Sequence, residues 1–400
     1  MTRTLMVIVV ITSLLVIYVM EFKVYHGSNE GRKSNSGPTS FISEQIPTKA
    51  NGIQQNTSKD NLVANTNISK DQVPGIKCSK RFNIAFLKTH KSGSTTVSNI
   101  LYRFAIRNRL NLALPNKRGK PNHWVLGDLT NFTDASILRL PTGEHYNILA
   151  VESIYRRDVF RRIVPSNPYF LTIVREPVDR FISYVFFNKK NNVEGMPYVI
   201  KNSFLKDKVF KMAAKGMSLD FGMKYNGSKL LLDPRRFVQN ITTDFDLILV
   251  AEYFDESLLL LKRQLCWELK DIIYISKNVN AQKRNYALDA HDVERVRNLT
   301  QVDNMLYSKS KTKLLKQIWK LGIEFLDEVF HFKGVLKLVK NYCVHGMKHF
   351  SNTTIPESEW NQRFSVTEGD CRYLLMDEPT LVGNLQERTW LRYTKFRDGF

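Results

Sequence analysis

Residues 82–107 constrain the fold of this chain more than any other stretch. Residues 82–87 form a short apolar run with the composition of a buried strand. Residues 88–95 are then polar or small, and almost none of them suits a core. After this loop, apolar side chains recur at the spacing of one helical face: Val97, Ile100, Leu101, Phe104 and Ala105. The stretch therefore predicts a strand, a short polar loop and a helix, in that order.

Cations and hydroxyls crowd the loop between this strand and this helix. We call residues 88–96 the cradle loop, and its members are Lys88, Thr89, His90, Lys91, Ser92, Gly93, Ser94, Thr95 and Thr96. A helix N-terminus with free backbone N–H groups favours a bound anion, and these side chains add donors. The loop lacks the two spaced glycines of the nucleotide-triphosphate motif. It predicts a phosphate cradle, and an ordinary capped helix with solvated lysines is the alternative.

Strands and helices alternate along the following part of the chain. Further apolar runs of strand character lie at residues 146–151, 169–174, 246–250 and 272–275. This alternation predicts an α/β fold with a parallel sheet, whose ligands bind at the carboxyl ends of the strands. Lys88, Glu152 and Arg175 each directly follow a predicted strand. We therefore expect these three side chains on one rim of the sheet.

Three segments resemble those of a known family, the galactose 3-O-sulfotransferases. Residues 86–96 are similar to the family's 5′-phosphosulfate-binding loop, residues 171–183 to its 3′-phosphate-binding motif, and residues 252–269 to a third family segment. The similarity covers roughly residues 78–330 in the same order. It implies the P-loop-like parallel sheet, flanked by helices, of sulfotransferases that use 3′-phosphoadenosine 5′-phosphosulfate (PAPS). It also implies a galactose-terminated glycolipid or glycan as the acceptor, sulfated at its 3-hydroxyl.

The resemblance assigns donor-binding roles to individual residues. Lys88 and Lys91 would supply cations to the phosphosulfate, and the rest of the cradle loop would supply hydrogen-bond donors. Arg175 and Ser183 would bind the 3′-phosphate through a guanidinium and a hydroxyl. From the residues alone, a surface ion pair of Arg175 with Glu176 or Asp179 is the alternative. The sequence has no cluster at metal-ligand spacing, so we expect no metal requirement.

The general base for the acceptor hydroxyl is where the sequence departs from the family. Related enzymes carry a histidine at the end of the second strand, where this chain has Glu152. A carboxylate can take the proton, and His90 in the cradle loop is the rival. Alternatively, Glu152 pairs with a nearby arginine and has no catalytic role. The departure also leaves another sugar position, or a glycosaminoglycan, open as the acceptor.

The N-terminus carries an uncharged apolar run at residues 5–20, after Arg3. We expect a cytosolic tail at residues 1–4, a transmembrane signal-anchor at 5–22, a disordered lumenal stem at 23–77 and a catalytic domain at 78–400. A cleaved signal peptide is the alternative, but the sequence shows no cleavage site after the run. The orientation rests partly on the resemblance, which implies a type II protein of the Golgi membrane.

Glycosylation sequons, cysteines and net charge fit a secretory lumen. Seven sequons lie at Asn56, Asn67, Asn131, Asn226, Asn240, Asn298 and Asn352. The four cysteines form an even set compatible with disulfides. Cys343 and Cys371 are near each other in the sequence and are the expected pair, whereas Cys266 lies in an apolar segment and is a candidate buried thiol. The formal charge of +21 implies an anionic partner.

Two other functional classes are compatible with a phosphate cradle. A kinase-like glycan enzyme would use ATP, but it would need carboxylates for Mg²⁺ near the loop. A catalytically silent lumenal protein would bind an acidic glycan without turnover. We expect no nucleic-acid partner, because the sequence contains no recognised nucleic-acid-binding module.

Overall fold

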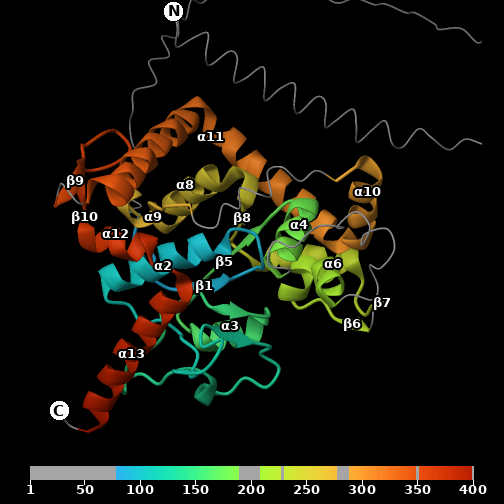
Figure 1. The fold of residues 1–400 in the computed structure, drawn as a ribbon, viewed down its shortest axis with the longest axis horizontal. Coiled ribbons are helices and arrows are strands. Elements are labelled where there is room, and N and C mark those ends of the chain that lie inside the picture. The colour runs from blue at the N-terminus through green and yellow to red at the C-terminus, as the bar shows by residue number, and fades with distance from the viewer. Residues whose placement is uncertain (1–77, 189–207, 227–228, 277–287, 348–350, 399–400) are drawn as a thin grey trace, which may run out of the picture. The chain divides into compact units, whose positions relative to one another are not determined.

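The computed structural model describes residues 78–188, 208–226, 229–276, 288–347 and 351–398 (Figure 1). The predicted cytosolic tail, signal-anchor and stem, residues 1–77, lie outside the described residues. Among the residues that are described, no helix combines the length and the apolar character needed to span a bilayer. The described part falls within one compact unit, Gly75–Phe400.

A four-stranded parallel sheet forms the centre of this unit. Its strands are β1 (Ile84–Leu87), β3 (Ile148–Leu149), β5 (Tyr169–Val174) and β8 (Leu247–Val250), in the order β3-β1-β5-β8. Ile84 pairs with both Ile148 and Tyr169, and Leu171 pairs with Leu247. Every residue of these strands is buried, which explains their continuous apolar runs. The predicted α/β fold with a parallel sheet flanked by helices is confirmed.

Helices cover the sheet and build a second, smaller core beside it. The helices that follow β1, β5 and β8 are α2 (Ser94–Asn108), α4 (Pro177–Asn188) and α8 (Phe254–Leu265). The long α11 (Gln301–Asn341), orange in Figure 1, packs against α8 and β8 and is interrupted at Gly322. The smaller core joins α4 to α6 (Lys208–Asp220) and α10 (Ala290–Leu299).

The remaining described elements are short or peripheral. They are β2 (Val125–Gly127), η1 (Asp134–Ser136), β4 (Glu152–Ser153), α3 (Arg157–Ile163), β6 (Tyr225–Asn226), β7 (Lys229–Leu230), α7 (Pro234–Asp244), η2 (Ala251–Tyr253), α9 (Leu269–Ile272), η4 (Tyr342–Gly346), β9 (Asn352–Ile355), β10 (Phe364–Thr367), α12 (Glu368–Leu375) and α13 (Glu378–Arg397). β4 pairs with β2 in parallel, outside the central sheet.

The prediction of a strand at residues 272–275 is wrong. Leu269–Ile272 forms the short helix α9, which begins with a capping box between Glu268 and Asp271. The following carbonyl of Ile273 accepts a hydrogen bond from the buried Arg103 instead of joining the sheet. The apolar run reflects burial, which a strand and a short buried helix share, so the sequence pattern did not separate them.

All four cysteines form disulfides. Cys343 pairs with Cys371, as predicted, and their Cα atoms are 5.2 Å apart. Cys266, a candidate buried thiol, instead pairs with Cys78 across 188 residues of sequence. This second disulfide fastens the start of the described chain to the end of α8.

Candidate active site

The cradle loop makes a sharp turn between β1 and α2. Lys91 and Gly93 both have left-handed backbone conformations, with φ of 63° and 88°. A Cβ added at Gly93 would lie 3.6 Å from the ring of Phe254, so the backbone angle, not space, requires glycine there. Gly93 also has no side chain that could cap α2. The start of α2 is therefore suited to an external anion.

Three of the loop's hydroxyls point inward and hold the loop together. The hydroxyl of Ser94 donates to the carbonyl of Thr89 at 2.6 Å, and that of Ser92 donates to the same carbonyl at 3.0 Å. The Thr89 hydroxyl donates to the carbonyl of Ile173 at 2.5 Å, which ties the loop to β5. All three side chains are buried, whereas Thr95 and Thr96 are half-buried. The three buried hydroxyls therefore fix the shape of the cradle loop.

Lys88 and Arg175 follow β1 and β5 as predicted, whereas Glu152 does not directly follow a strand of the central sheet and instead begins β4; all three lie around the cradle loop. Lys88 Nζ is 3.9 Å from Glu152 Oε2, and an Arg175 guanidinium nitrogen donates to the carbonyl of Lys91 at 3.1 Å. Arg175 also lies 3.5 Å from Asp179, so the alternative ion pair exists alongside the cradle contact. Ser183 lies half-buried on α4. The rim therefore combines the residues assigned to the phosphosulfate and to the 3′-phosphate.

His90 lies between two carboxylates. Its Nδ1 is 2.6 Å from Asp220 Oδ1, and its Nε2 is 2.8 Å from Glu152 Oε1. Burial lowers the pKa of His90, but the charge and hydrogen bond of Asp220, followed by those of Glu152, more than offset it and raise that pKa to about 10. Burial raises the pKa of Glu152, but the hydrogen bond and charge of His90 reverse this, and the net pKa is lowered. At neutral pH the trio is a protonated imidazole between two carboxylates.

Asp220 is a site residue that sequence reasoning missed. It accepts from the backbone N–H of His90 at 2.8 Å as well as from the ring. Its own carbonyl accepts from the N–H of Tyr155, three residues beyond Glu152. Asp220 lies 130 residues from His90 at the end of α6, and nothing in its local sequence marks it. The fold alone brings it to the cradle loop.

A buried aspartate on α11 supports Asp220. Asp303 accepts from the N–H groups of Met217 and Ser218, each at 2.8 Å. A Cβ at Gly216 would lie 2.0 Å from Asp303 Oδ2, so only glycine allows this approach. Arg180, in the segment that resembles the 3′-phosphate motif, is buried 3.8 Å from Asp303. Arg180 therefore supports the end of α6, while Arg175 is at the rim.

Glu378 is the second missed residue. It begins α13, far along the chain, and its Oε2 lies 2.5 Å from Lys88 Nζ. Thr95 in the cradle loop also donates to Glu378 Oε2, at 3.4 Å. Figure 1 shows α13 (red) running from the centre of the unit toward the C-terminus. The C-terminal helix thus contributes a third carboxylate to the site.

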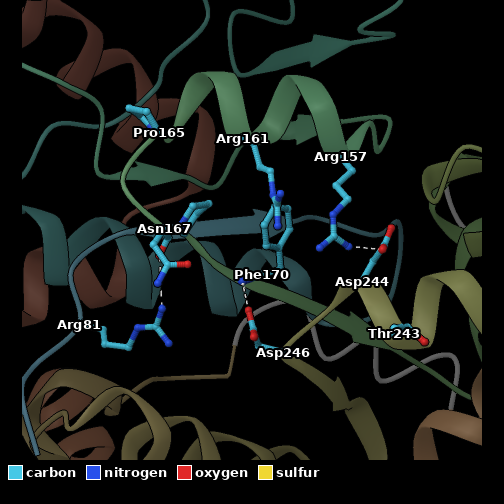
Figure 2. A pocket seen from close by; sticks show the side chains of 10 residues that line it. Arg81, Arg157, Arg161, Pro165, Asn167, Phe170, Thr243, Asp244 and Asp246 are labelled. Atoms are coloured by element: carbon cyan, nitrogen blue, oxygen red, sulfur yellow. Dashed lines mark hydrogen bonds and ion pairs between the residues drawn. The ribbon is translucent and has the colours of Figure 1, made fainter.

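A separate cavity of about 460 Å³ lies at the amino ends of the strands (Figure 2). Arg161 lies over the ring of Phe170, Arg157 pairs with Asp244, and Arg81 donates to the carbonyl of Asn167. None of the residues predicted for the site lines it. Elsewhere, Asp289, His291 and Asp292 bring potential ligand atoms within 4.8 Å of one another at the start of α10. The expectation of no metal requirement therefore stays a prediction.

Comparisons of the sequence with known proteins identify a family and several relatives. The sequence matches the family model described as galactose-3-O-sulfotransferase over residues 4–362. Galactosylceramide sulfotransferase of Homo sapiens is 29% identical over 288 residues, which cover 68% of this chain and 66% of that protein. Galactose-3-O-sulfotransferase 2 of Mus musculus is 30% identical over 239 residues, covering 56% of this chain and 60% of that protein. The chain thus aligns with 60–66% of the length of these two relatives.

Proposed function

The chain belongs to the galactose-3-O-sulfotransferase family, and from this premise we propose that it transfers a sulfuryl group from PAPS to the 3-hydroxyl of a galactose residue. The acceptor is a galactose-terminated glycolipid or glycan; galactosylceramide, named in one relative, is such a glycolipid. One observation carries the proposal. Lys88, His90 and Glu152 are in contact where the cradle loop leaves the sheet. Another sugar position, or a glycosaminoglycan, is the alternative acceptor.

The cradle loop suits the phosphosulfate end of PAPS. Lys88 and Lys91 supply positive charge, and the uncapped start of α2 supplies backbone N–H groups. Thr95 and Thr96 add hydroxyls, while the inward hydroxyls of the loop keep its shape. His90 contributes further positive charge while it is protonated. These groups stabilise the negative charge that develops on the oxygens of the transferring group.

In the proposed complex Arg175 and Ser183 hold the 3′-phosphate of PAPS. Arg175 follows β5 and already touches the cradle loop through the carbonyl of Lys91. Its guanidinium can turn from Asp179 to a phosphate, which offers two negatively charged oxygens to its fork. A donor held at both its phosphates is fixed in position for in-line transfer.

Glu152 is the general base of the proposed reaction. Both ring nitrogens of His90 face carboxylates and the ring is protonated, so it has no lone pair for the acceptor's proton. The acceptor oxygen forms its bond to sulfur while the bond between sulfur and the 5′-phosphate oxygen breaks. Adenosine 3′,5′-bisphosphate leaves, and the hydroxyl proton goes to the Glu152 carboxylate. His90 and Asp220 hold that carboxylate in place.

The proposed location is the lumenal side of the Golgi membrane, with residues 5–22 as the signal-anchor, 23–77 as the stem and 78–400 as the catalytic domain. Two disulfides support an oxidising compartment. The five sequon asparagines that fall within the described residues are all exposed, as glycosylation requires. N-terminal sequencing of the mature protein tests the anchor, because a secreted product beginning near residue 24 would contradict it.

Incubation of the full-length protein with labelled PAPS and a panel of galactosides tests the activity. We expect label on the galactose 3-hydroxyl, mapped by mass spectrometry and NMR, in the absence of divalent metal. Transfer only from ATP with Mg²⁺ would favour the kinase-like alternative. Glycan binding without any turnover would favour the silent binding protein. Label on another position would retain the activity and correct the acceptor.

A further inference from the structure

Lys88 is held from the side of the C-terminal helix. Its Nζ lies 2.5 Å from Glu378 Oε2 but 3.9 Å from Glu152 Oε2, so Glu378 is the closer of the two carboxylates. The side chains of Lys88 and Glu378 are only 8% and 10% exposed. The cation assigned to the phosphosulfate is therefore fixed by a buried ion pair with the first residue of α13.

Stability does not account for this pair. Glu378 Oε1 is buried and finds no hydrogen-bond donor among the described residues. The hydroxyl of Tyr102 is near, but it donates to the carbonyl of Ala150. A buried carboxylate with an unsatisfied oxygen costs free energy of folding, and a buried ion pair seldom repays it. Such departures from good packing mark functional sites in proteins.

The start of α13 is fixed independently of the cradle loop. Asp377 caps the helix by accepting from the N–H of Thr380 at 3.0 Å. The Pro379 carbonyl lies 2.9 Å from His123 Nε2. The fully buried Gln386 donates to the carbonyls of Pro115 and His123. These contacts place the Glu378 backbone without any help from Lys88.

We propose that Glu378 is a positioning residue that aims the Lys88 ammonium into the cradle loop for sulfuryl transfer. This inference rests on the proposed function and adds a residue to it. The match to the family model ends at residue 362, before α13 begins, so it does not include Glu378. By this inference, the C-terminal helix α13 is part of the active site.

The physical reason lies in the lysine side chain. Lysine has a flexible four-carbon stem and three N–H donors, and fixing it loses considerable rotamer entropy. When Glu378 accepts from one N–H group of Lys88, the lysine side chain is already oriented. Its other N–H groups remain available to the oxygens of PAPS. The negative charge of Glu378 does not attract PAPS, so its contribution is to the rate of transfer and not to donor affinity.

The test compares Glu378→Gln with Glu387→Gln in the full-length protein. Glu387 lies on the same helix but forms an exposed pair with Arg118, so it is a matched control. In Glu378→Gln we expect kcat to fall on the order of a hundredfold, the effect of a misplaced catalytic group. We expect the Kd for PAPS, measured by calorimetry, to be unchanged or lower, and the KM for the acceptor to be unchanged. Glu387→Gln should match the wild type.

Acylation of lysines, read by mass spectrometry, gives a second measurement that needs no turnover. We expect Lys88 to be labelled faster in Glu378→Gln than in the wild type. Unchanged labelling or unchanged kcat would overturn the inference. A lower kcat with weaker PAPS binding would mean that Glu378 has only a structural role. A higher kcat with tighter PAPS binding would mean that Glu378 inhibits transfer. Either result would also overturn the inference. A wild type that does not bind PAPS would instead refute the proposed function.

Discussion

Charged side chains gather at both ends of the central sheet, and the two ends use them differently. At the amino ends, Asp244 accepts from Arg157, and Asp246 accepts from the N–H of Phe170 (Figure 2). Asp244 also accepts from the hydroxyl of Tyr155. Arg157 remains 39% exposed. At the carboxyl ends, Asp220, Lys88 and Glu378 are 10% exposed or less. Both ends have partly exposed charges, since His90 is as exposed as Arg157, but only the carboxyl end combines them with these three buried charges.

The difference shows which observations identify a site. The amino end has the cavity of about 460 Å³, yet its carboxylates already have partners. The carboxyl end holds a histidine with a strongly raised pKa and a carboxylate oxygen without a donor. Buried charges and shifted pKa values are costly, and they cluster at functional sites. We therefore expect substitutions at the carboxyl end to affect transfer and those at the amino end to leave it unchanged.

The largest effect is expected for Glu152→Gln. This change keeps the shape and a hydrogen-bonding oxygen but removes basicity, so kcat should fall about a hundredfold to ten thousandfold. PAPS binding should survive, because a negative charge has been removed near an anionic donor. His90→Asn is the control. Normal turnover in Glu152→Gln, with an inactive His90→Asn that still binds PAPS, would make His90 the base.

Lys88→Ala paired with Arg161→Ala tests the two ends directly. Loss of the Lys88 cation should lower kcat on the order of a hundredfold or more, because a preorganised group no longer meets the developing charge. Arg161, which lines the cavity at the amino end, should be replaceable with no change in kcat or in the Kd for PAPS. Steady-state kinetics measures both. Equal losses of kcat in Lys88→Ala and Arg161→Ala would refute the expected difference between the two ends of the sheet.

Arg175→Ala should act on donor affinity. A hydrogen bond to a charged group contributes about 1.5–3 kcal/mol, so the Kd for PAPS should rise about tenfold to a hundredfold. Because Arg175 also contacts Asp179, replacement of Asp179 by Asn serves as a control that frees the guanidinium. An unchanged Kd in Arg175→Ala would leave Arg175 with only its surface ion pair.

The smallest effect is on stability at alkaline pH. The pKa of His90 is raised in the folded protein to about 10. The resulting stabilisation is complete below about pH 6.5, the unfolded value, and is lost as pH rises through about 10. Because the ring is 39% exposed and partly screened, the slope should stay below about 1.4 kcal/mol per pH unit. Urea unfolding between pH 6 and 10 should show that the free energy of unfolding changes less with pH in Asp220→Asn than in the wild type. The same pH dependence in both proteins would contradict a raised pKa of His90.

The sequence by itself determined the parts of the molecule that depend on local pattern. The apolar run before Lys88, the small polar stretch around Gly93 and the helical stripe after it specify the strand, cradle loop and α2. The positions of Lys88 and Arg175 directly after buried strands placed both at one rim. Side-chain periodicity and the backbone freedom of glycine act over a few residues, so a sequence displays them directly.

Only the tertiary structure decided which distant side chains complete the site. Asp220 reaches His90 from 130 residues away, and Glu378 reaches Lys88 from 290 residues away. It also decided that the apolar residues around Ile272 form a short helix, and that Cys266 pairs with Cys78. The contacts of Asp220 and Glu378 follow from how the helices that carry them pack around the sheet. Packing depends on the summed burial of many residues, and no local pattern around Asp220 or Glu378 records it.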